Sequence, residues 1–288
     1  MRPEDWHFID DLDAFLARAG DFLRSRPALH TVPLTVTEGL RTRGWGHDGS
    51  EAPYFGVLES AGTIRAAYFR TPPYPLNVTP LTPEEADSLA AHLAGLDRPV
   101  PGVNGERATI DALARSWEEH TGATVTLRQR QRLYRLGTLT VPQPVPQGRP
   151  RVAGTADREQ LITWYGEFVA AIGEENRGPG RAEGWADSRI SYGGTTFWED
   201  TDGTPLSMAG LTPMVAGQIR VAPVYTPAHL RGRGYAGAVT AEVSRAALAA
   251  GAAEVLLFTD LANPTSNALY QRIGYRAVAD FGVYDFAE

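Results

Sequence analysis

The 288-residue sequence contains no cysteine. Disulfides, thiol nucleophiles and cysteine-ligated zinc sites are therefore excluded, and the redox compartment stays open. Histidine is scarce as well, with six residues and no closely spaced pair among them. Because metal sites need clustered ligands, we expect no bound metal.

Long apolar runs are also missing. No uninterrupted stretch approaches the length of a membrane-spanning helix, and residues 1–6 lack the apolar core of a signal peptide. We therefore expect a cytoplasmic protein without a membrane partner. The net charge of −7 argues against nucleic acid as a partner, because a phosphate backbone requires a basic face. An acidic surface would suit a cationic amine substrate, although it also serves solubility alone.

A proline-dense segment at residues 140–150 divides the sequence into two parts of similar length. It has neither helical nor alternating apolar periodicity, as is typical of a linker. The chain is long enough for two hydrophobic cores. The sequence therefore predicts two domains, at residues 1–145 and 150–288.

The most informative motif is Arg231-Gly232-Arg233-Gly234-Tyr235-Ala236-Gly237, which lies between an apolar strand-like run and an alanine-rich helical run. Glycines allow close approach of a ligand, and the start of a helix presents unpaired N–H groups to an anion. Two arginines in the same turn suit a pyrophosphate. The motif therefore predicts a site for a phosphate-bearing cofactor.

Two cofactor classes fit this spacing. Gly232-x-Gly234-x-x-Gly237 matches a dinucleotide fingerprint, and Asp260 follows where a ribose-binding acid would be sought. However, the tail after Gly237 is too short for the remaining strands of a doubly wound sheet. A nicotinamide-dependent oxidoreductase is therefore a distant alternative.

The same residues resemble a second pattern more fully. Arg231-x-x-Gly234-x-Ala236 resembles the Arg/Gln-x-x-Gly-x-Gly/Ala signature of the GNAT acyl-CoA-dependent acetyltransferases. Residues 219–227 look like the family's fourth strand, which a bulge interrupts, and residues 263–275 look like its closing segment, in which an Asn precedes a Tyr on a short helix. The resemblance covers residues 150–288.

The resemblance implies an α/β (α+β) fold with a mixed, mostly antiparallel sheet flanked by helices. In the second half we expect a helix from about residue 155, a hairpin of strands 195–200 and 206–211, strand 219–225, helix 235–250, strand 255–259, a helix beginning at Pro264, and short strands at 275–278 and 283–286.

In the first half the patterns predict a helix at 5–26, a hairpin of 54–58 and 64–70, helices at 83–95 and 106–120, and a strand at 124–127. This order echoes the second half but lacks the arginine–glycine loop. We therefore expect a degenerate N-terminal copy of the GNAT fold in tandem, which shapes the acceptor site. An unrelated α+β domain is the alternative.

The resemblance implies acetyl-CoA as the cofactor and transfer of its acetyl group to a primary amine of a small molecule or peptide by direct attack. Pro223 cannot donate a ladder hydrogen bond, so a bulge there would leave main-chain groups available to the pantetheine and the thioester. Asn267 would bind the pantetheine arm, whereas Asn263 serves as a helix cap. The expected cofactor-binding residues are Val221, Ala222, Pro223, Val224, Tyr225, Thr226, Arg231, Gly232, Arg233, Gly234, Tyr235, Ala236, Gly237, Asn263, Asn267 and Tyr270.

Tyr270 lies where the family places the general acid that protonates the departing thiolate. Core packing is the competing interpretation. Glu199 and Asp260 are candidates for a base that acts through water, although each also fits an ordinary turn or strand end. A non-catalytic acyl-CoA-binding or regulatory protein would keep the arginine–glycine loop without a competent acid and base. The sequence leaves the oligomeric state open, with a homodimer as one option.

Overall fold

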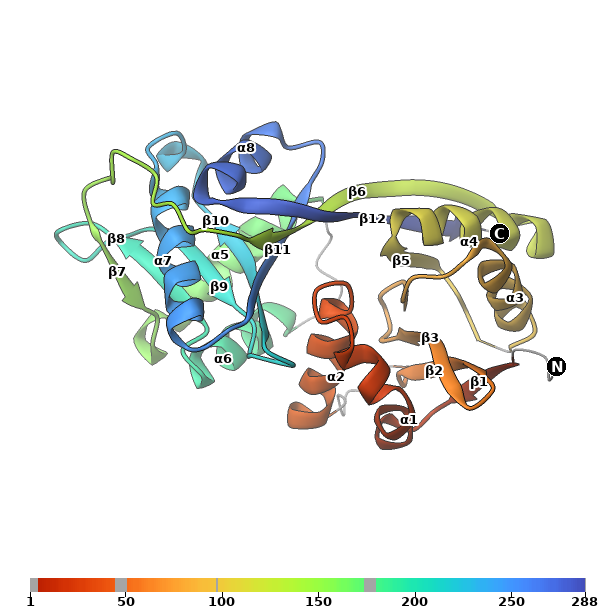
Figure 1. Cartoon of the computed structure of the whole chain (residues 1–288). Helices are drawn as coiled ribbons and strands as arrows, with labels where there is room; N and C mark the ends of the chain where they lie inside the picture. The colour runs from red at the N-terminus through yellow and green to blue at the C-terminus, as the bar shows by residue number, and fades with distance from the viewer. Residues whose placement is uncertain (1–4, 45–50, 97, 174–179, 288) are drawn as a thin grey trace. The chain divides into compact units, whose positions relative to one another are not determined.

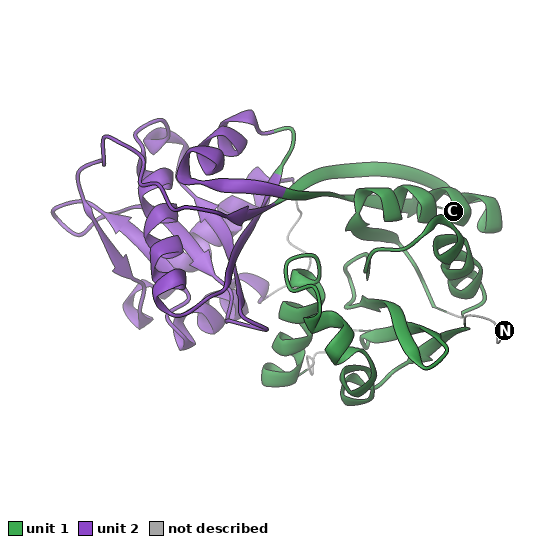
Figure 2. Cartoon of the chain, in the orientation of Figure 1, with its two compact units in different colours: residues 1–133, 260–262, 278–288 green, residues 134–259, 263–277 purple. Residues whose placement is uncertain are grey.

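The chain divides into two compact units (Figure 2). The computed structural model describes residues 5–44, 51–96, 98–173 and 180–287. Unit 1 comprises residues 1–133, 260–262 and 278–288, and unit 2 comprises residues 134–259 and 263–277. The division falls inside two long strands, β6 (Thr124–Leu136) and β12 (Tyr275–Ala287), so each contributes residues to both units. The units are therefore not the two continuous segments that the proline-dense stretch suggested.

Unit 1 contains a sheet and four described helices (Figure 1). Its strand order is β1-β2-β3-β4-β5-β12-β6, in which β4 and β5 are parallel and β1, β2, β3 and β4 are joined by antiparallel pairing. The bounds are β1 (Asp5–Ile9), α1 (Leu12–Arg24), α2 (Thr31–Arg43), β2 (Tyr54–Ser60), β3 (Thr63–Arg70), β4 (Leu76–Val78), α3 (Pro83–Ala94), β5 (Gly102–Glu106) and α4 (Arg107–Thr121).

The prediction of a helix over residues 5–26 is wrong for residues 5–9. Residues 5–9 form β1, which pairs residue by residue with 55–59 of β2. The helix begins only after Asp11, whose carboxylate accepts a hydrogen bond from Ala14 N at 2.7 Å. Pairing with a strand some fifty residues away overrides the local pattern there, while the N-cap fixes where α1 starts.

Unit 2 has the strand order β12-β6-β11-β10-β9-β8-β7. The pair β10–β11 is parallel, whereas β10–β9, β9–β8 and β8–β7 are antiparallel. The bounds are β7 (Arg149–Val152), α5 (Arg158–Ala171), α6 (Arg181–Ser191), β8 (Thr195–Glu199), β9 (Pro205–Leu211), β10 (Gln218–Tyr225), α7 (Tyr235–Ala249), β11 (Glu254–Asp260) and α8 (Pro264–Ile273).

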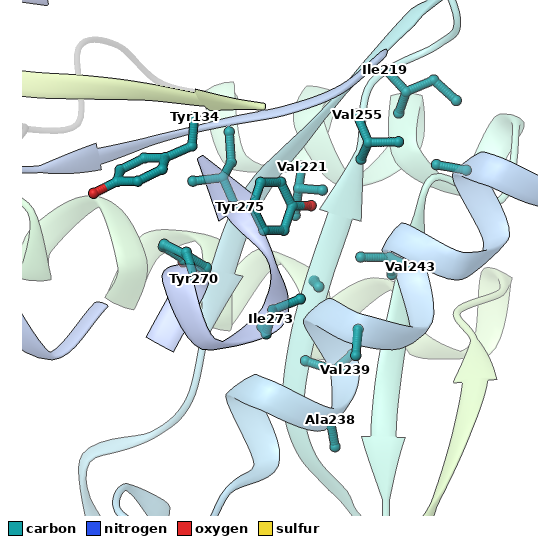
Figure 3. Close-up of a cluster of buried hydrophobic side chains, with 14 of the residues drawn as sticks. Tyr134, Ile219, Val221, Ala238, Val239, Val243, Val255, Tyr270, Ile273 and Tyr275 are labelled. Atoms are coloured by element: carbon teal, nitrogen blue, oxygen red, sulfur yellow. The ribbon is translucent and has the colours of Figure 1, made fainter. Parts of the chain in front are cut away.

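Alternating side chains give the sheet of unit 2 two buried faces. Trp198 and Ala209 belong to the cluster that contains residues of α7 and α8, part of which is shown in Figure 3. Their neighbours Phe197 and Met208 belong to a second cluster, with residues of α5 and α6. Because successive side chains of a strand point to opposite faces, the two helix pairs cover opposite faces of this sheet.

Three features of unit 2 differ from the expectation. Strand β7 begins at Arg149, inside the segment that was expected to be a linker. The C-terminal segment is one continuous strand, β12, rather than two short ones. Helix α6 was not expected, although Ala182, Trp185, Ala186 and Ile190 recur at helical spacing and the last three pack in or against the second cluster.

The same order of elements occurs twice along the chain. From β1 to β6, and again from β7 to β12, a strand is followed by two helices, three strands, a helix, a strand, a helix and a strand. In both copies the last of the three consecutive strands is a parallel neighbour of the strand that follows the next helix. These pairs are β4 and β5 in the first copy, and β10 and β11 in the second. The predicted duplication, with mixed and mostly antiparallel sheets flanked by helices, is thereby confirmed.

Candidate functional site

The parallel strands β10 and β11 separate part of the way along their length. They pair at three positions, from Gln218 opposite Glu254 to Arg220 opposite Leu256. Beyond Arg220 no residue of β10 is paired with a described residue of β11, so residues 221–225 of β10 pair only with β9. This edge offers main-chain donors and acceptors to a ligand.

A bulge lies where this unpaired edge begins. Val221 is opposite Leu211 and Val224 is opposite Ala209, so Ala222 and Pro223 share the single residue Gly210 as their partner. The interruption expected at Pro223 is therefore present, and the Ala222–Pro223 peptide bond is cis. A Cβ atom at Gly210 would lie 2.5 Å from the carbonyl oxygen of Ala222, so the bulge requires glycine there.

Arg189 of α6 holds the bulge in place. Its guanidinium donates to the carbonyl oxygen of Ala222 at 3.1 Å and also to that of Leu211. The same guanidinium lies 5.6 Å from the ring centroid of Trp185 and 5.9 Å from that of Tyr192. The sequence analysis missed Arg189, because its role depends on the position of the unexpected helix α6.

The arginine–glycine loop connects β10 to α7. Gly232 and Gly234 have positive φ angles of 77° and 86°, and Gly234 precedes the first turn of α7. Arg231 donates through Nε to the carbonyl oxygen of Thr226 at 3.1 Å, and Arg233 donates to that of His229 at 3.2 Å. These bonds fold the loop back on the end of β10 and leave residues 231–234 exposed.

The N-terminus of α7 has no acidic or capping side chain of its own. No side chain caps it, and its first turn contains no acidic residue. The first N–H groups of a helix lack intrahelical partners and carry partial positive charge. With Arg231 and Arg233 beside them, these groups fit a phosphate or pyrophosphate.

The proline-dense segment packs beside this loop within unit 2. A Cβ atom at Gly237 would lie 3.1 Å from Leu269 and 3.5 Å from Pro142. At Gly234 the nearest atoms would be those of Pro146, at 3.7 Å. Residues 140–148 therefore support the loop and lead directly into β7, rather than serving only as a spacer.

Tyr270 is on α8, and its side chain lies among the residues of Figure 3. It is 8% exposed, and its ring meets that of Tyr275 edge-on at 6.1 Å between centroids. Within the described residues its hydroxyl has no hydrogen-bond partner. Burial raises the pKa of Tyr270 to about 12. The phenol is therefore protonated at neutral pH, as a general acid must be.

Asn263, which precedes α8, and Asn267, within α8, belong to one hydrogen-bond network. Asn263 caps the helix by accepting from Ser266 N at 3.0 Å. Asn267 donates to the carbonyl oxygen of Asn263 at 2.8 Å and accepts from the hydroxyl of Tyr134 at 2.9 Å. The cap role of Asn263 is as expected, whereas the Asn267 amide is already engaged in tying α8 to β6. Sequence reasoning missed Tyr134, which lies over a hundred residues away.

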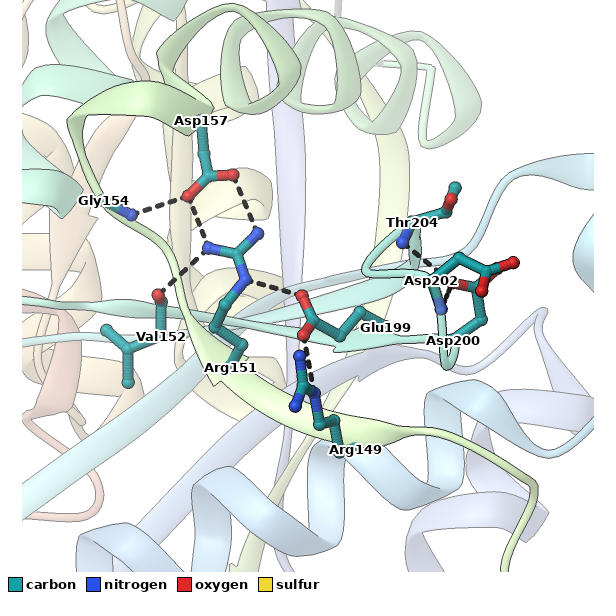
Figure 4. A network of polar contacts seen from close by, with 9 residues as sticks. All are labelled: Arg149, Arg151, Val152, Gly154, Asp157, Glu199, Asp200, Asp202 and Thr204. Carbon is teal, nitrogen blue, oxygen red and sulfur yellow. Dashed lines mark hydrogen bonds and ion pairs between the residues drawn. The ribbon is translucent and has the colours of Figure 1, made fainter.

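Glu199 is the centre of an ion-pair network (Figure 4). Its side chain accepts from Arg149 Nε at 2.9 Å and from Arg151 Nε at 2.6 Å. Arg151 also binds both carboxylate oxygens of Asp157. The hydrogen bond from Arg151, with that from Arg149, lowers the pKa of Glu199. A carboxylate stabilised in this way is a poor proton acceptor, so its position fits a structural role.

Asp260, the other candidate base, stabilises a turn. Its carboxylate accepts from the backbone N–H of Ala262 at 2.7 Å. Residues 260–262 group with unit 1, whereas the loop and Tyr270 are in unit 2.

A further carboxylate contacts β10 from α5. The hydroxyl of Tyr225 donates to Glu167 at 2.7 Å. Burial, followed by this hydrogen bond, raises the pKa of Tyr225 to about 12. Glu167 lies outside the expected site residues, because an exposed acid on an amphipathic helix carries no signal in a single sequence.

One protein-family model matches the segment that contains the loop. Residues 213–281, which contain β10, the loop, α7 and most of the C-terminal segment, match the family described as FR47-like protein. A sequence search against curated proteins finds no match.

Solved structures match over nearly the whole chain. A GNAT-family acetyltransferase from Colwellia psychrerythraea has a TM-score of 0.62 and 14% identity, with 99% of this chain and 100% of that one covered. A GCN5-related N-acetyltransferase from Sphaerobacter thermophilus has a TM-score of 0.63 and 19% identity, covering 99% and 96%. A tandem GNAT protein from the clavulanic acid biosynthesis pathway has a TM-score of 0.60 and 13% identity, covering 99% and 98%. The resemblance expected from the sequence is confirmed: the chain has the fold of the GNAT superfamily in a tandem arrangement, with an FR47-like segment in its second copy.

Proposed function

We propose that the protein is an N-acetyltransferase that moves an acetyl group from acetyl-CoA to a primary amine of a small molecule or peptide. The observation that carries this proposal is the separation of β10 from β11 directly before the uncapped N-terminus of α7. A long ligand with an amide-bearing arm and a pyrophosphate matches these two features in their order along the chain.

Each part of the site has a role in this proposal. The amides of Gly232 to Gly237, with Arg231 and Arg233, bind the pyrophosphate. Main-chain groups of residues 221–226 align the pantetheine arm, and Arg189 keeps the bulge in the geometry that this alignment needs. Acetyl-CoA supplies an acetyl group activated as a thioester.

The transfer requires no covalent enzyme intermediate. The neutral amine attacks the thioester carbonyl carbon, the new C–N bond forms, and the C–S bond breaks. Tyr270 donates its proton to the departing thiolate, and the proton that the amine loses passes to water and restores the phenol. Glu199 is not part of this scheme, because its carboxylate is engaged by two arginines.

The first experiment mixes the protein with acetyl-CoA and a panel of amines and follows CoA release with a thiol reagent. The 288 residues contain no cysteine, so every thiol detected comes from CoA. They also contain no lysine, so no ε-amine of the chain competes as an acceptor. We expect amine-dependent thiol release together with an acetylated product detected by mass spectrometry.

Two variants make this assay specific. Arg231→Gln removes a cation of the loop and should reduce the rate, whereas Arg245→Gln changes an exposed arginine of α7 that pairs with Glu242 and should not. Tight binding of acetyl-CoA without thiol release for any amine would contradict catalysis and favour an acyl-CoA-binding regulatory protein.

A further inference from the structure

Unit 1 contains a cavity of about 430 Å³ that is distinct from the loop of unit 2. Three segments line it: the end of α1 with the connection to α2, the start of β3, and the connection from β4 to α3. This volume is within the range of small-molecule sites. The polar residues that matter most are Arg26, His30, Arg65, Thr82 and Glu85.

His30 lines this cavity with an unused hydrogen-bond acceptor. Its side chain is fully buried, and its Nδ1 lies 3.0 Å from the carbonyl oxygen of Leu23. A carbonyl only accepts, so Nδ1 carries the hydrogen and Nε2 of the neutral ring is an acceptor. Burial lowers the pKa of His30, which favours this neutral form. Among the described residues Nε2 has no partner.

The charges around the cavity favour an anion. Arg26 is exposed and forms no direct ion pair with a described residue, but its charge acts on the nearby carboxyl group of Glu106. Arg65 is 3.6 Å from the Glu85 carboxylate, with more than half of its own side chain exposed. Glu85 also accepts from the backbone N–H of Thr82 at 2.8 Å. The lining therefore contains two guanidinium groups and one carboxylate that is already hydrogen-bonded, while Glu106, the other carboxyl group near Arg26, lies outside the lining.

The adjoining helix, α3, offers no phosphate site at its N-terminus, because its own side chains already cap it. Thr82 caps α3 by accepting from Glu85 N at 3.2 Å, and Glu85 completes a reciprocal capping box. Glu84 adds a second acid to the first turn. Because α7 has neither feature, the copy of the fold in unit 1 lacks the anion site of unit 2 and offers a different set of groups.

We propose that the cavity binds a small anion that also carries a hydroxyl or amine group, with the anion at Arg26 and Arg65 and the O–H or N–H donating to His30 Nε2. Such a ligand supplies the missing donor to Nε2 and offsets the excess positive charge of the lining. The site is independent of the acetyl transfer proposed for unit 2, because it shares no residue with the loop, β10 or α8.

Calorimetric titration of the full chain with two matched pairs of probes tests the proposal. Malate and succinate differ by one hydroxyl, and glycerol 3-phosphate and inorganic phosphate differ by a hydroxyl-bearing group. We expect the hydroxyl-bearing member of at least one pair to bind about tenfold more tightly than its partner, since one neutral hydrogen bond to His30 separates them. The pair that binds distinguishes a carboxylate from a phosphate ligand.

Variants on the exposed rim avoid disturbing the core. Arg26→Gln should weaken binding of the preferred probe by roughly tenfold or more, because it removes a charge-assisted hydrogen bond. Arg24→Gln is the matched control, since Arg24 pairs with Asp21 and does not line the cavity, and it should leave binding unchanged. In ¹⁵N-histidine spectra the preferred probe should shift the Nε2 signal of one histidine, and that signal should be missing in His30→Gln.

Three results would overturn the proposal. They are absence of binding by all four probes at millimolar concentration, equal binding by both members of each pair, and equal weakening by Arg26→Gln and Arg24→Gln. CoA binding that Arg26→Gln abolishes would also contradict it, because the cavity would then be a second CoA site.

Discussion

At the scale of single residues, burial and partners decide which of the candidate side chains can act. Tyr270 is buried, protonated and without a hydrogen-bond partner among the described residues. Glu199 is buried too, but two arginines neutralise it. The sequence suggested Tyr270 as an acid and Glu199 as a base. It could not show that Glu199 is already engaged, because Arg149 and Arg151 lie 50 and 48 residues upstream and only the pairing of β7 with β8 brings them to it.

Replacing Tyr270 by Phe tests the proposed general acid. The ring keeps its volume and its edge-on contact with Tyr275, so stability and acetyl-CoA affinity should change little. The acetyl-transfer rate should fall by about 10²–10⁴-fold, the usual effect of losing acid catalysis. Steady-state thiol release and calorimetry measure the two quantities separately.

Tyr275→Phe is the matched control. It removes the 2.7 Å hydrogen bond to Ser244 and should cost about 1–2 kcal/mol of stability with little effect on the rate. Equal rates in wild type and Tyr270→Phe would exclude Tyr270 as the acid.

The Glu199 network should stabilise the protein in a pH-dependent way. Hydrogen bonds from arginine lower the pKa values of both Glu199 and Asp157. A carboxylate with a lowered folded pKa stabilises the fold above its unfolded pKa, and this contribution is lost as the pH falls through the folded pKa. Wild type should therefore melt above Glu199→Gln at pH 7, and the difference should shrink as the pH falls below the ordinary value of 4.5. A difference in melting temperature that stays constant on acidification would contradict this role.

At the scale of secondary-structure elements, the site depends on the bulge in β10 and its support by α6. Sequence patterns predicted the hairpins β2–β3 and β8–β9 and the helices α3, α4, α7 and α8, because caps, turns and apolar periods mark them locally. They did not predict β1, α2, β4, β5, β7, α6 or the continuity of β12. Several of those elements depend on partners distant in the sequence, such as residues 55–59 for β1 and residues 102–106 for β12.

Gly210→Ala tests whether the bulge is required. The added methyl group would meet the Ala222 carbonyl oxygen at 2.5 Å, so either the bulge or β9 must shift. We expect a loss of about 1–3 kcal/mol in the free energy of unfolding and weaker acetyl-CoA binding, measured by urea denaturation and calorimetry.

Gly166→Ala in α5 provides the control for this change. No atom lies within 4 Å of the position of its Cβ, and alanine favours helix, so this variant should gain up to about 1 kcal/mol. Unchanged stability and acetyl-CoA affinity in Gly210→Ala would show that the bulge tolerates displacement.

At the scale of the whole molecule, two copies of one order of elements share their long strands. Phe286, near the end of the chain, stacks on Trp117 of unit 1 at 5.3 Å, and Tyr284 donates to Asp111 at 3.0 Å. Tyr134, from before the proline-dense segment, belongs to the core of unit 2. The sequence predicted the duplication. It could not show that β6 and β12 each contribute residues to both units, because an apolar strand pattern does not specify its neighbours. No described helix has the length and apolar composition of a membrane span.

Separate fragments test the importance of the shared strands. Fragment 1–145 lacks residues 278–288, and fragment 150–288 lacks residues 134–136, so each should lose cooperative thermal unfolding by circular dichroism. A fusion of 1–133 to 278–288 through a flexible linker should regain it. Cooperative unfolding of both simple fragments would show that the shared segments are dispensable.

The central claim is that acetyl-CoA binds through the loop of residues 231–237 at the N-terminus of α7. Calorimetric titration of wild type, Arg231→Gln, Gly234→Ala and Arg245→Gln with acetyl-CoA, free CoA and NADH tests it most directly. We predict binding of both CoA species but not NADH, roughly tenfold weaker binding in each loop variant, and no change in Arg245→Gln. Absence of binding by either CoA species, or binding of NADH alone, would contradict the account.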